Sequence, residues 1–246
     1  MSGRKYDGGF THPDHGGKLT LPMILNELKE TAIETNKEWA ARLGINPSTA
    51  ITCVKPSGTV SQLVNSASGI HPRFSPQYNR TVRADNKDPL AKYMVEAGFP
   101  YEEALGFDGK PQGNGQLVFS FPVKSPKGAV TVPEVSAIEQ LELVKTYNEH
   151  WCEHKASCTI YYRDSEFLAV AQWLWDNFDT VSGVSLLPRD DHVYIQAPYQ
   201  PLDKSEYSEM KRGFPKMDMK AFAAYEVEDN TTGSQELACV GNACEL

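Results

Sequence analysis

Helical and strand-like patterns alternate along most of the chain, and this alternation limits the possible folds more than any other feature. Apolar residues recur every three to four positions in 22–43 and in 133–150, which predicts two amphipathic helices. Short runs rich in β-branched and aromatic residues predict strands at 49–54, 118–123, 157–162 and 184–187. Such alternation predicts an α/β fold, built either as layers or as a barrel.

Shorter segments complete this prediction. Further helices are expected at 60–65, 89–97, 164–178 and 205–212. Residues 68–89 are comparatively basic and show no clear period, so they are expected to be irregular. In the helix at 164–178, the helical spacing predicts that Val170, Leu174 and Phe178 face inward.

Composition excludes several classes of protein. The chain has 246 residues and a formal net charge of −8, which argues against a broad nucleic-acid surface because such surfaces cluster Lys and Arg. Apolar runs are far too short for a membrane span, and the first ten residues lack the apolar region of a secretory signal. We therefore expect a cytoplasmic protein with neither a membrane nor a nucleic-acid partner.

A small polar loop, KPSGT at residues 55–59, joins a predicted strand to a predicted helix. Small residues let the backbone approach an oxyanion, and the first N–H groups of a helix point outward without intrahelical partners. Ser57 and Thr59 add hydroxyl donors, and Lys55 adds positive charge. The same residues also fit an ordinary strand-to-helix turn with a Ser or Thr cap. The loop alone leaves both interpretations open.

Two cysteines, Cys239 and Cys244, lie near the end of the sequence in a C-x4-C pair. The polar segment 228–238 before them has the composition of a mobile tether. Gly241 and Asn242 can adopt the positive φ values that a tight reversal requires, as a disulfide between the pair would need. The pattern favours a redox dithiol, while half of a zinc site or two ordinary terminal cysteines are the alternatives.

A second pattern, His150, Glu153 and His154, satisfies the H-x-x-E-H spacing of one class of zinc hydrolase. A polar helix end, where His complements the helix dipole, explains the same residues, and no metal site is predicted. The other three cysteines are expected to be inert thiols that pack as small apolar residues, namely Cys53, Cys152 and Cys158.

The run ITCVKPSGTVSQLVNSASGIHPRFSPQYNRTVR, residues 51–83, resembles a stretch of the adenosylcobalamin-dependent, or class II, ribonucleotide reductases. Residues 34–45 and 184–207 resemble the same family, and the segment 184–207 most closely resembles its ribonucleoside-triphosphate branch. The resemblance implies the C-terminal portion of a ten-stranded α/β barrel with a flexible C-terminal tail. Residues 1–190 would belong to the barrel, 191–227 to a peripheral extension and 228–246 to a mobile redox tail.

The resemblance also implies roles for particular residues. The phosphates of the substrate would bind to Pro56, Ser57, Gly58, Thr59, Val60 and Ser61. Cys239 and Cys244 would re-reduce an active-site disulfide and then be recharged by thioredoxin or a similar dithiol protein. Adenosylcobalamin would be the cofactor, with its contacts in this chain unknown, and the reaction would convert ribonucleoside triphosphates to 2′-deoxyribonucleotides.

Other parts of the family pattern have no counterpart in this chain. Its radical cysteine, its catalytic glutamate and the first cysteine of its active-site pair belong to upstream segments. We therefore expect the chain to be inactive without an N-terminal half, and its initial Met suggests a divided gene or a truncated reading frame. A non-catalytic fragment that still binds nucleotides is the alternative.

Overall fold

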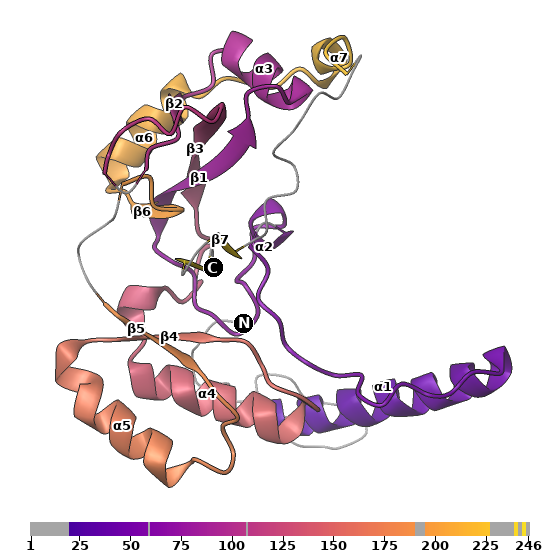
Figure 1. Ribbon diagram of the computed structural model, residues 1–246. Helices are drawn as coiled ribbons and strands as arrows, with labels where there is room; N and C mark the ends of the chain where they lie inside the picture. The colour runs from indigo at the N-terminus through magenta and orange to yellow at the C-terminus, as the bar shows by residue number, and fades with distance from the viewer. Residues whose placement is uncertain are drawn as a thin grey trace. The chain divides into compact units, whose positions relative to one another are not determined.

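The computed structural model describes residues 20–58, 60–106, 108–189, 195–226, 239–240 and 243–244 (Figure 1). Its helices are α1 (Leu21–Leu43), α2 (Val60–Leu63), α3 (Pro89–Glu96), α4 (Ala137–His150), α5 (Phe167–Asp176), α6 (Lys204–Gly213) and α7 (Met219–Phe222), with 3-10 turns at Val132–Glu134 and Asp164–Glu166. Its strands are β1 (Gln77–Asp85), β2 (Tyr101–Glu103), β3 (Gln116–Lys124), β4 (Thr159–Tyr162), β5 (Ser185–Pro188), β6 (Tyr199–Pro201), β7 (Cys239–Val240) and β8 (Ala243–Cys244).

The chain divides into two compact units. Unit 1 is formed by two segments of the sequence, and part of unit 2 lies between them. Unit 1 comprises Met1–Arg73 and Pro126–Asp190. Unit 2 comprises Phe74–Ser125 and Asp191–Leu246. The two units are defined by contacts within this chain. They do not test the domain boundaries predicted after residues 190 and 227, which stay a prediction.

Unit 1 is built around α4 and the parallel pair β4–β5, with α5 forming the connection between the two strands (Figure 1). Leu141 and Val144 of α4 pack with Ile160 of β4 in the core. The start of α4 is fixed by a capping box, in which Ser136 and Glu139 each bond the backbone of the other. The first turn of α1 joins this core through Leu21 and Leu25, which lie in the same cluster.

Unit 2 contains an antiparallel sheet with the strand order β2-β3-β1-β6. Strands β1 and β3 pair along their full length, from Gln77 opposite Lys124 to Asp85 opposite Gln116. One group of buried residues links α3 to β3, with Phe214 packed against it: Ala91, Met94, Phe99 and Phe119. Apolar packing between α3 and this sheet therefore holds unit 2 together.

The prediction that residues 68–89 are irregular is wrong for 77–85, which form the long strand β1. Its consecutive residues Asn79, Arg80 and Thr81 are all buried, so no alternation of polar and apolar residues marks the strand. Each of the three makes hydrogen bonds with neighbouring segments. Asn79 Nδ2 donates to Ser120 Oγ and Gln200 Oε1, for example, and Thr81 Oγ1 donates to the carbonyl of Ala197.

Two further predictions about unit 1 are wrong. Residues 49–54 form no strand, although Thr52 is buried as expected of that segment. The segment forms hydrogen bonds with residues 152–157, but these bonds do not make the regular pattern that pairs two β-strands. Phe178 does not face inward, since 78% of its surface is exposed just beyond α5, whereas Val170 is buried as predicted.

The α/β class predicted from the sequence is confirmed. The described residues form sheets of four, two and two strands, and none of these closes into a barrel. Within the same residues, no helix combines the length and the apolar character needed to cross a membrane.

Shortening a core side chain should destabilise unit 1 selectively. Leu141 is fully buried, so Leu141→Ala is expected to lower the free energy of unfolding by about 2–5 kcal/mol. Leu168→Ala is the matched control, because 80% of Leu168 is exposed, and its effect should stay within about 0.5 kcal/mol. All four tryptophans lie in unit 1, so urea titration followed by tryptophan fluorescence reports on this unit. Equal effects of the two changes would contradict the assigned core.

Candidate functional site

The polar loop at 55–61 is closed by reciprocal hydrogen bonds between Ser57 and Ser61. The N–H of Ser61 donates to Ser57 Oγ at 3.0 Å, and Ser61 Oγ donates to the carbonyl of Ser57 at 3.0 Å. Ser61 is buried and Val60 is exposed at the first position of α2. The structure thus brings Ser57 and Ser61 together, while Thr59 lies outside the described residues.

A third serine, Ser68, binds the backbone of Ser57. The N–H of Ser57 donates to Ser68 Oγ at 2.8 Å, and Ser68 Oγ donates to the carbonyl of Ser57 at 3.0 Å. The next residue, Gly69, has φ of +55°. A Cβ atom there would lie 3.2 Å from the carbonyl oxygen of Lys55, so both the conformation and the close approach favour glycine.

His71 connects this arrangement to strand β4. Its Nδ1 lies 2.9 Å from the carbonyl of Ser68, and its Nε2 accepts a hydrogen bond from the N–H of Thr159 at 2.9 Å. Both contacts are satisfied together when Nδ1 carries the proton and Nε2 is bare. Burial lowers the pKa of His71, which favours this neutral form.

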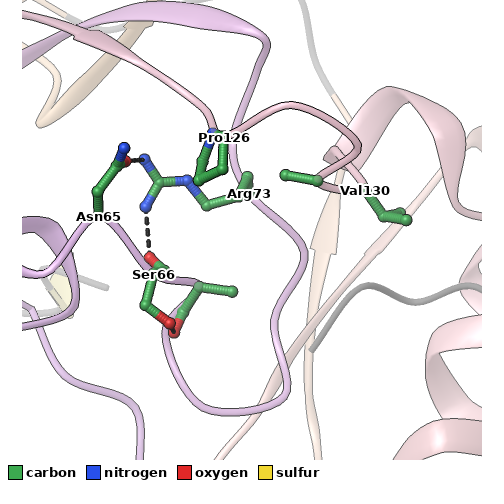
Figure 2. Close-up of a pocket in the computed structure, with 7 residues that line it drawn as sticks. Asn65, Ser66, Arg73, Pro126 and Val130 are labelled. Carbon is green, nitrogen blue, oxygen red and sulfur yellow. Dashed lines mark hydrogen bonds between the residues drawn. The ribbon is translucent and has the colours of Figure 1, made fainter.

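Arg73 fixes the segment that follows α2 and lines a pocket in unit 1 (Figure 2). Its guanidinium donates to Asn65 Oδ1 at 2.9 Å and to the carbonyl of Ser66. Asn65 has φ of +50°, a conformation that Asn tolerates better than most residues. The pocket has a volume of about 220 Å³ and is lined by Asn65, Ser66, Ala67, Arg73, Pro126, Ala129 and Val130.

Neither Lys55 nor the predicted phosphate loop contributes to this pocket. The ammonium group of Lys55 donates instead to the carbonyl of Lys155 at 3.1 Å and to Ser157 Oγ at 3.2 Å. Lys55 therefore holds the extended segment before the loop against 155–157, a structural role that the sequence did not indicate.

Glu153, the central residue of the H-x-x-E-H pattern, binds backbone. Its Oε2 accepts hydrogen bonds from the N–H groups of Ile51 at 2.6 Å and Thr52 at 2.8 Å. These bonds, that of Thr52 first, hold the pKa of Glu153 below its ordinary value of 4.5. His150 Nδ1 lies 3.2 Å from Asn26 Oδ1, and among the described residues no group of three His, Cys, Asp or Glu side chains could hold a metal. The geometry gives Glu153 a structural role and leaves the zinc-hydrolase interpretation without support.

Four of the five cysteines fall into two groups, and the fifth, Cys53, is a half-buried free thiol. Cys152 and Cys158 are buried free thiols, and burial raises the pKa of both, that of Cys158 to about 12. Such thiols carry little thiolate at neutral pH, which fits the predicted inert role. Cys239 and Cys244 lie on β7 and β8, whose antiparallel register places them directly opposite each other. The tether predicted at 228–238 lies outside the described residues.

The segment before that tether is attached to α3 by contacts that sequence reasoning missed. Tyr93 Oη donates to the carbonyl of Asp218 at 3.1 Å and accepts from its N–H at 2.9 Å. The rings of Phe222 and Tyr225 lie 5.8 Å and 5.2 Å from that of Tyr93. Tyr225 Oη also donates to Glu96 Oε2 at 2.6 Å. Unit 2 thus holds the chain firmly up to Tyr225.

Comparison with known proteins gives a consistent set of relatives. No family model matches the chain. A probable adenosylcobalamin-dependent ribonucleoside-triphosphate reductase of Dictyostelium discoideum is 30% identical over 201 residues, which cover 80% of this chain and 25% of the relative. The adenosylcobalamin-dependent ribonucleoside-triphosphate reductase of Euglena gracilis is 28% identical over 209 residues, covering 84% and 27%. The chain therefore spans about a quarter of the length of these curated relatives.

A solved structure shares the fold. The crystal structure of a B12-dependent, class II ribonucleotide reductase matches with a TM-score of 0.70 and 23% identity. The match covers 88% of this chain and 31% of the solved chain. The resemblance inferred from the sequence is thus confirmed, and the partial coverage fits a C-terminal part.

The bonds to Glu153 predict a specific dependence of stability on pH. Because its folded pKa lies below the unfolded value, the carboxylate stabilises the fold above about pH 4.5, and this contribution is lost as pH falls through the folded pKa. Glu153→Gln should therefore lower the urea midpoint at pH 7 and flatten its fall below pH 4.5. Glu34→Gln, at an exposed position of α1, should leave the curve unchanged. Stoichiometric zinc lost in the Glu153 variant would contradict the structural role.

Proposed function

We propose that this chain, which is homologous to one part of the class II, adenosylcobalamin-dependent ribonucleotide reductases, supplies that enzyme's substrate-phosphate loop and its terminal dithiol. The complete enzyme would convert ribonucleoside triphosphates to 2′-deoxyribonucleotides in the cytoplasm. The observation that carries the proposal is the similarity to named triphosphate reductases over 80% of the chain, including the KPSGT loop.

The loop geometry supports a phosphate-binding role for Pro56, Ser57, Gly58, Thr59, Val60 and Ser61. Gly58 has no side chain to keep an oxyanion away from its backbone. The hydrogen bonds between Ser57 and Ser61 hold the two ends of this turn together. A fixed turn loses less conformational entropy when the ligand binds.

The backbone register of Cys239 and Cys244 supports a redox pair. Directly opposed residues of an antiparallel pair have Cα atoms about 4.5–5.5 Å apart, within the roughly 4.4–6.8 Å that a disulfide requires. In the proposed cycle a ribose 2′-hydroxyl is replaced by hydrogen and leaves as water, while an active-site dithiol becomes a disulfide. Cys239 and Cys244 reduce that disulfide by exchange, and a thioredoxin-like protein reduces them in turn.

Other functions are assigned to the remaining part of the enzyme. It would supply the radical cysteine, the catalytic glutamate and the strands that complete a ten-stranded barrel around β4 and β5. Adenosylcobalamin, which supplies the radical when bound, does not fit the pocket beside Arg73. That pocket is about 220 Å³, whereas sites for much smaller drug-sized molecules occupy about 300–1,000 Å³. This pocket is therefore not assigned to the cofactor, whose contacts in this chain stay unassigned.

Nucleotide binding tests the loop directly. A nucleoside triphosphate such as ATP at about 100 times its Kd should stabilise the chain by about 2.7 kcal/mol, seen as a higher Tm. Gly58→Ala should reduce this shift, because a Cβ would enter the space of the oxyanion. Gly213→Ala is the control, since nothing lies within 4 Å of a Cβ at that position. A shift without turnover in the assembled enzyme would favour the non-catalytic nucleotide-binding alternative, and no shift would count against the loop assignment.

The tail is tested by turnover. When the chain is combined with the remaining part of the reductase and adenosylcobalamin, changing Cys239 and Cys244 together to Ser should leave the first turnover intact. Later turnovers driven by thioredoxin should be lost, because the active-site disulfide is no longer re-reduced. The control is Cys53→Ser, which changes a half-buried cysteine outside the tail. This variant should retain repeated turnover. Single-turnover and steady-state product yields distinguish these outcomes, and loss of the first turnover in the tail variant would refute the assignment.

A further inference from the structure

We infer that Ser68 is a positioning residue for the phosphate loop, holding Ser57 in the conformation that binds the nucleotide. The inference rests on the function proposed for the loop. It concerns a residue outside KPSGT, in the segment 68–72, for which no role was predicted from the sequence.

The first argument is that one hydroxyl engages both backbone groups of one loop residue. Ser68 Oγ accepts from the N–H of Ser57 at 2.8 Å and donates to its carbonyl at 3.0 Å. These two bonds fix the peptide groups on either side of Ser57. Ser57 Oγ then accepts from the N–H of Ser61, so the orientation of Ser57 is passed on to the start of α2.

The second argument is that Ser68 is itself anchored to a rigid element. Its carbonyl accepts hydrogen bonds from the N–H of His71 at 3.0 Å and from His71 Nδ1 at 2.9 Å. His71 Nε2 in turn accepts from the N–H of Thr159 on β4. A continuous series of hydrogen bonds thus runs from the loop to the strand, and a binding group is held most precisely when it is supported in this way.

Ser66 offers a matched comparison two residues earlier. Its hydroxyl is exposed and makes a 3.4 Å hydrogen bond to the carbonyl of the adjacent Ala67. Ser66→Ala and Ser68→Ala remove the same atom from the same segment. Only the second removes hydrogen bonds to Ser57.

The first measurement needs no ligand. In the full chain, NMR hydrogen exchange of the Ser57 amide should become about tenfold faster in Ser68→Ala and stay unchanged in Ser66→Ala, because only the former loses the acceptor of that amide. Unchanged exchange in Ser68→Ala would overturn the inference. This result stands whether or not the chain binds nucleotides.

The second measurement connects the loop to binding. ATP affinity of the full chain, measured by calorimetry, should fall about tenfold in Ser68→Ala and remain at the wild-type value in Ser66→Ala. If wild type does not bind ATP, the proposed function fails while the exchange result still decides whether Ser68 holds Ser57. Faster exchange with unchanged affinity would overturn the positioning role.

Conservative changes at His71 separate positioning from general stability. Asn at this position can keep a donor near the site of Nδ1, and Gln can keep an acceptor near the site of Nε2. Because support passes through both bonds of His71, each variant should speed Ser57 exchange and weaken ATP binding by more than its loss of Tm explains. If slow exchange and ATP affinity are lost only in proportion to the loss of Tm, His71 has a general structural role. That result would contradict support of the loop through His71.

Discussion

The hydrogen-bonding requirement of one extended segment, 51–57, is the constraint on which unit 1 depends. The segment is partly buried but belongs to no sheet, so its backbone groups need other partners. Glu153 accepts from Ile51 and Thr52, and the N–H of Ser157 donates to the carbonyl of Val54 at 3.3 Å. At the end of the segment, Ser68 Oγ forms hydrogen bonds with both backbone groups of Ser57. Structural side chains and the candidate site are therefore parts of one arrangement.

Local signals made much of the fold predictable. The helices α1 and α4 follow from their apolar periodicity, and Gly44 marks the end of α1. Strand β1 was not predicted because two of its buried residues, Asn79 and Arg80, are polar. Their hydrogen-bond partners lie about 40 and 120 residues away in sequence. Only the tertiary structure brings those partners into place.

The residues of the candidate site also divide into those that short sequence motifs identify and those that they do not. The KPSGT loop and the terminal cysteines were identified by short motifs, whose chemistry depends on neighbouring residues. The support from Ser68 and His71 was not, because it spans 11 residues to Ser57 and 88 residues to Thr159. One signal was available, since Gly69 marks a position of close backbone approach. Its location beside two hydrogen-bonding side chains could have drawn attention to the segment.

The interruption of unit 1 by residues 74–125 has a consequence for biosynthesis. A ribosome completes the first segment of unit 1 long before it makes α4 and β4, which form most of that unit's core. The first 73 residues must therefore wait without their packing partners while 52 residues of unit 2 emerge. Unit 2 has the same difficulty, because β6 pairs with β1 only after unit 1 is complete. Each unit thus matures only after its later segment has been made, so nascent chains halted between the two segments would expose apolar surface.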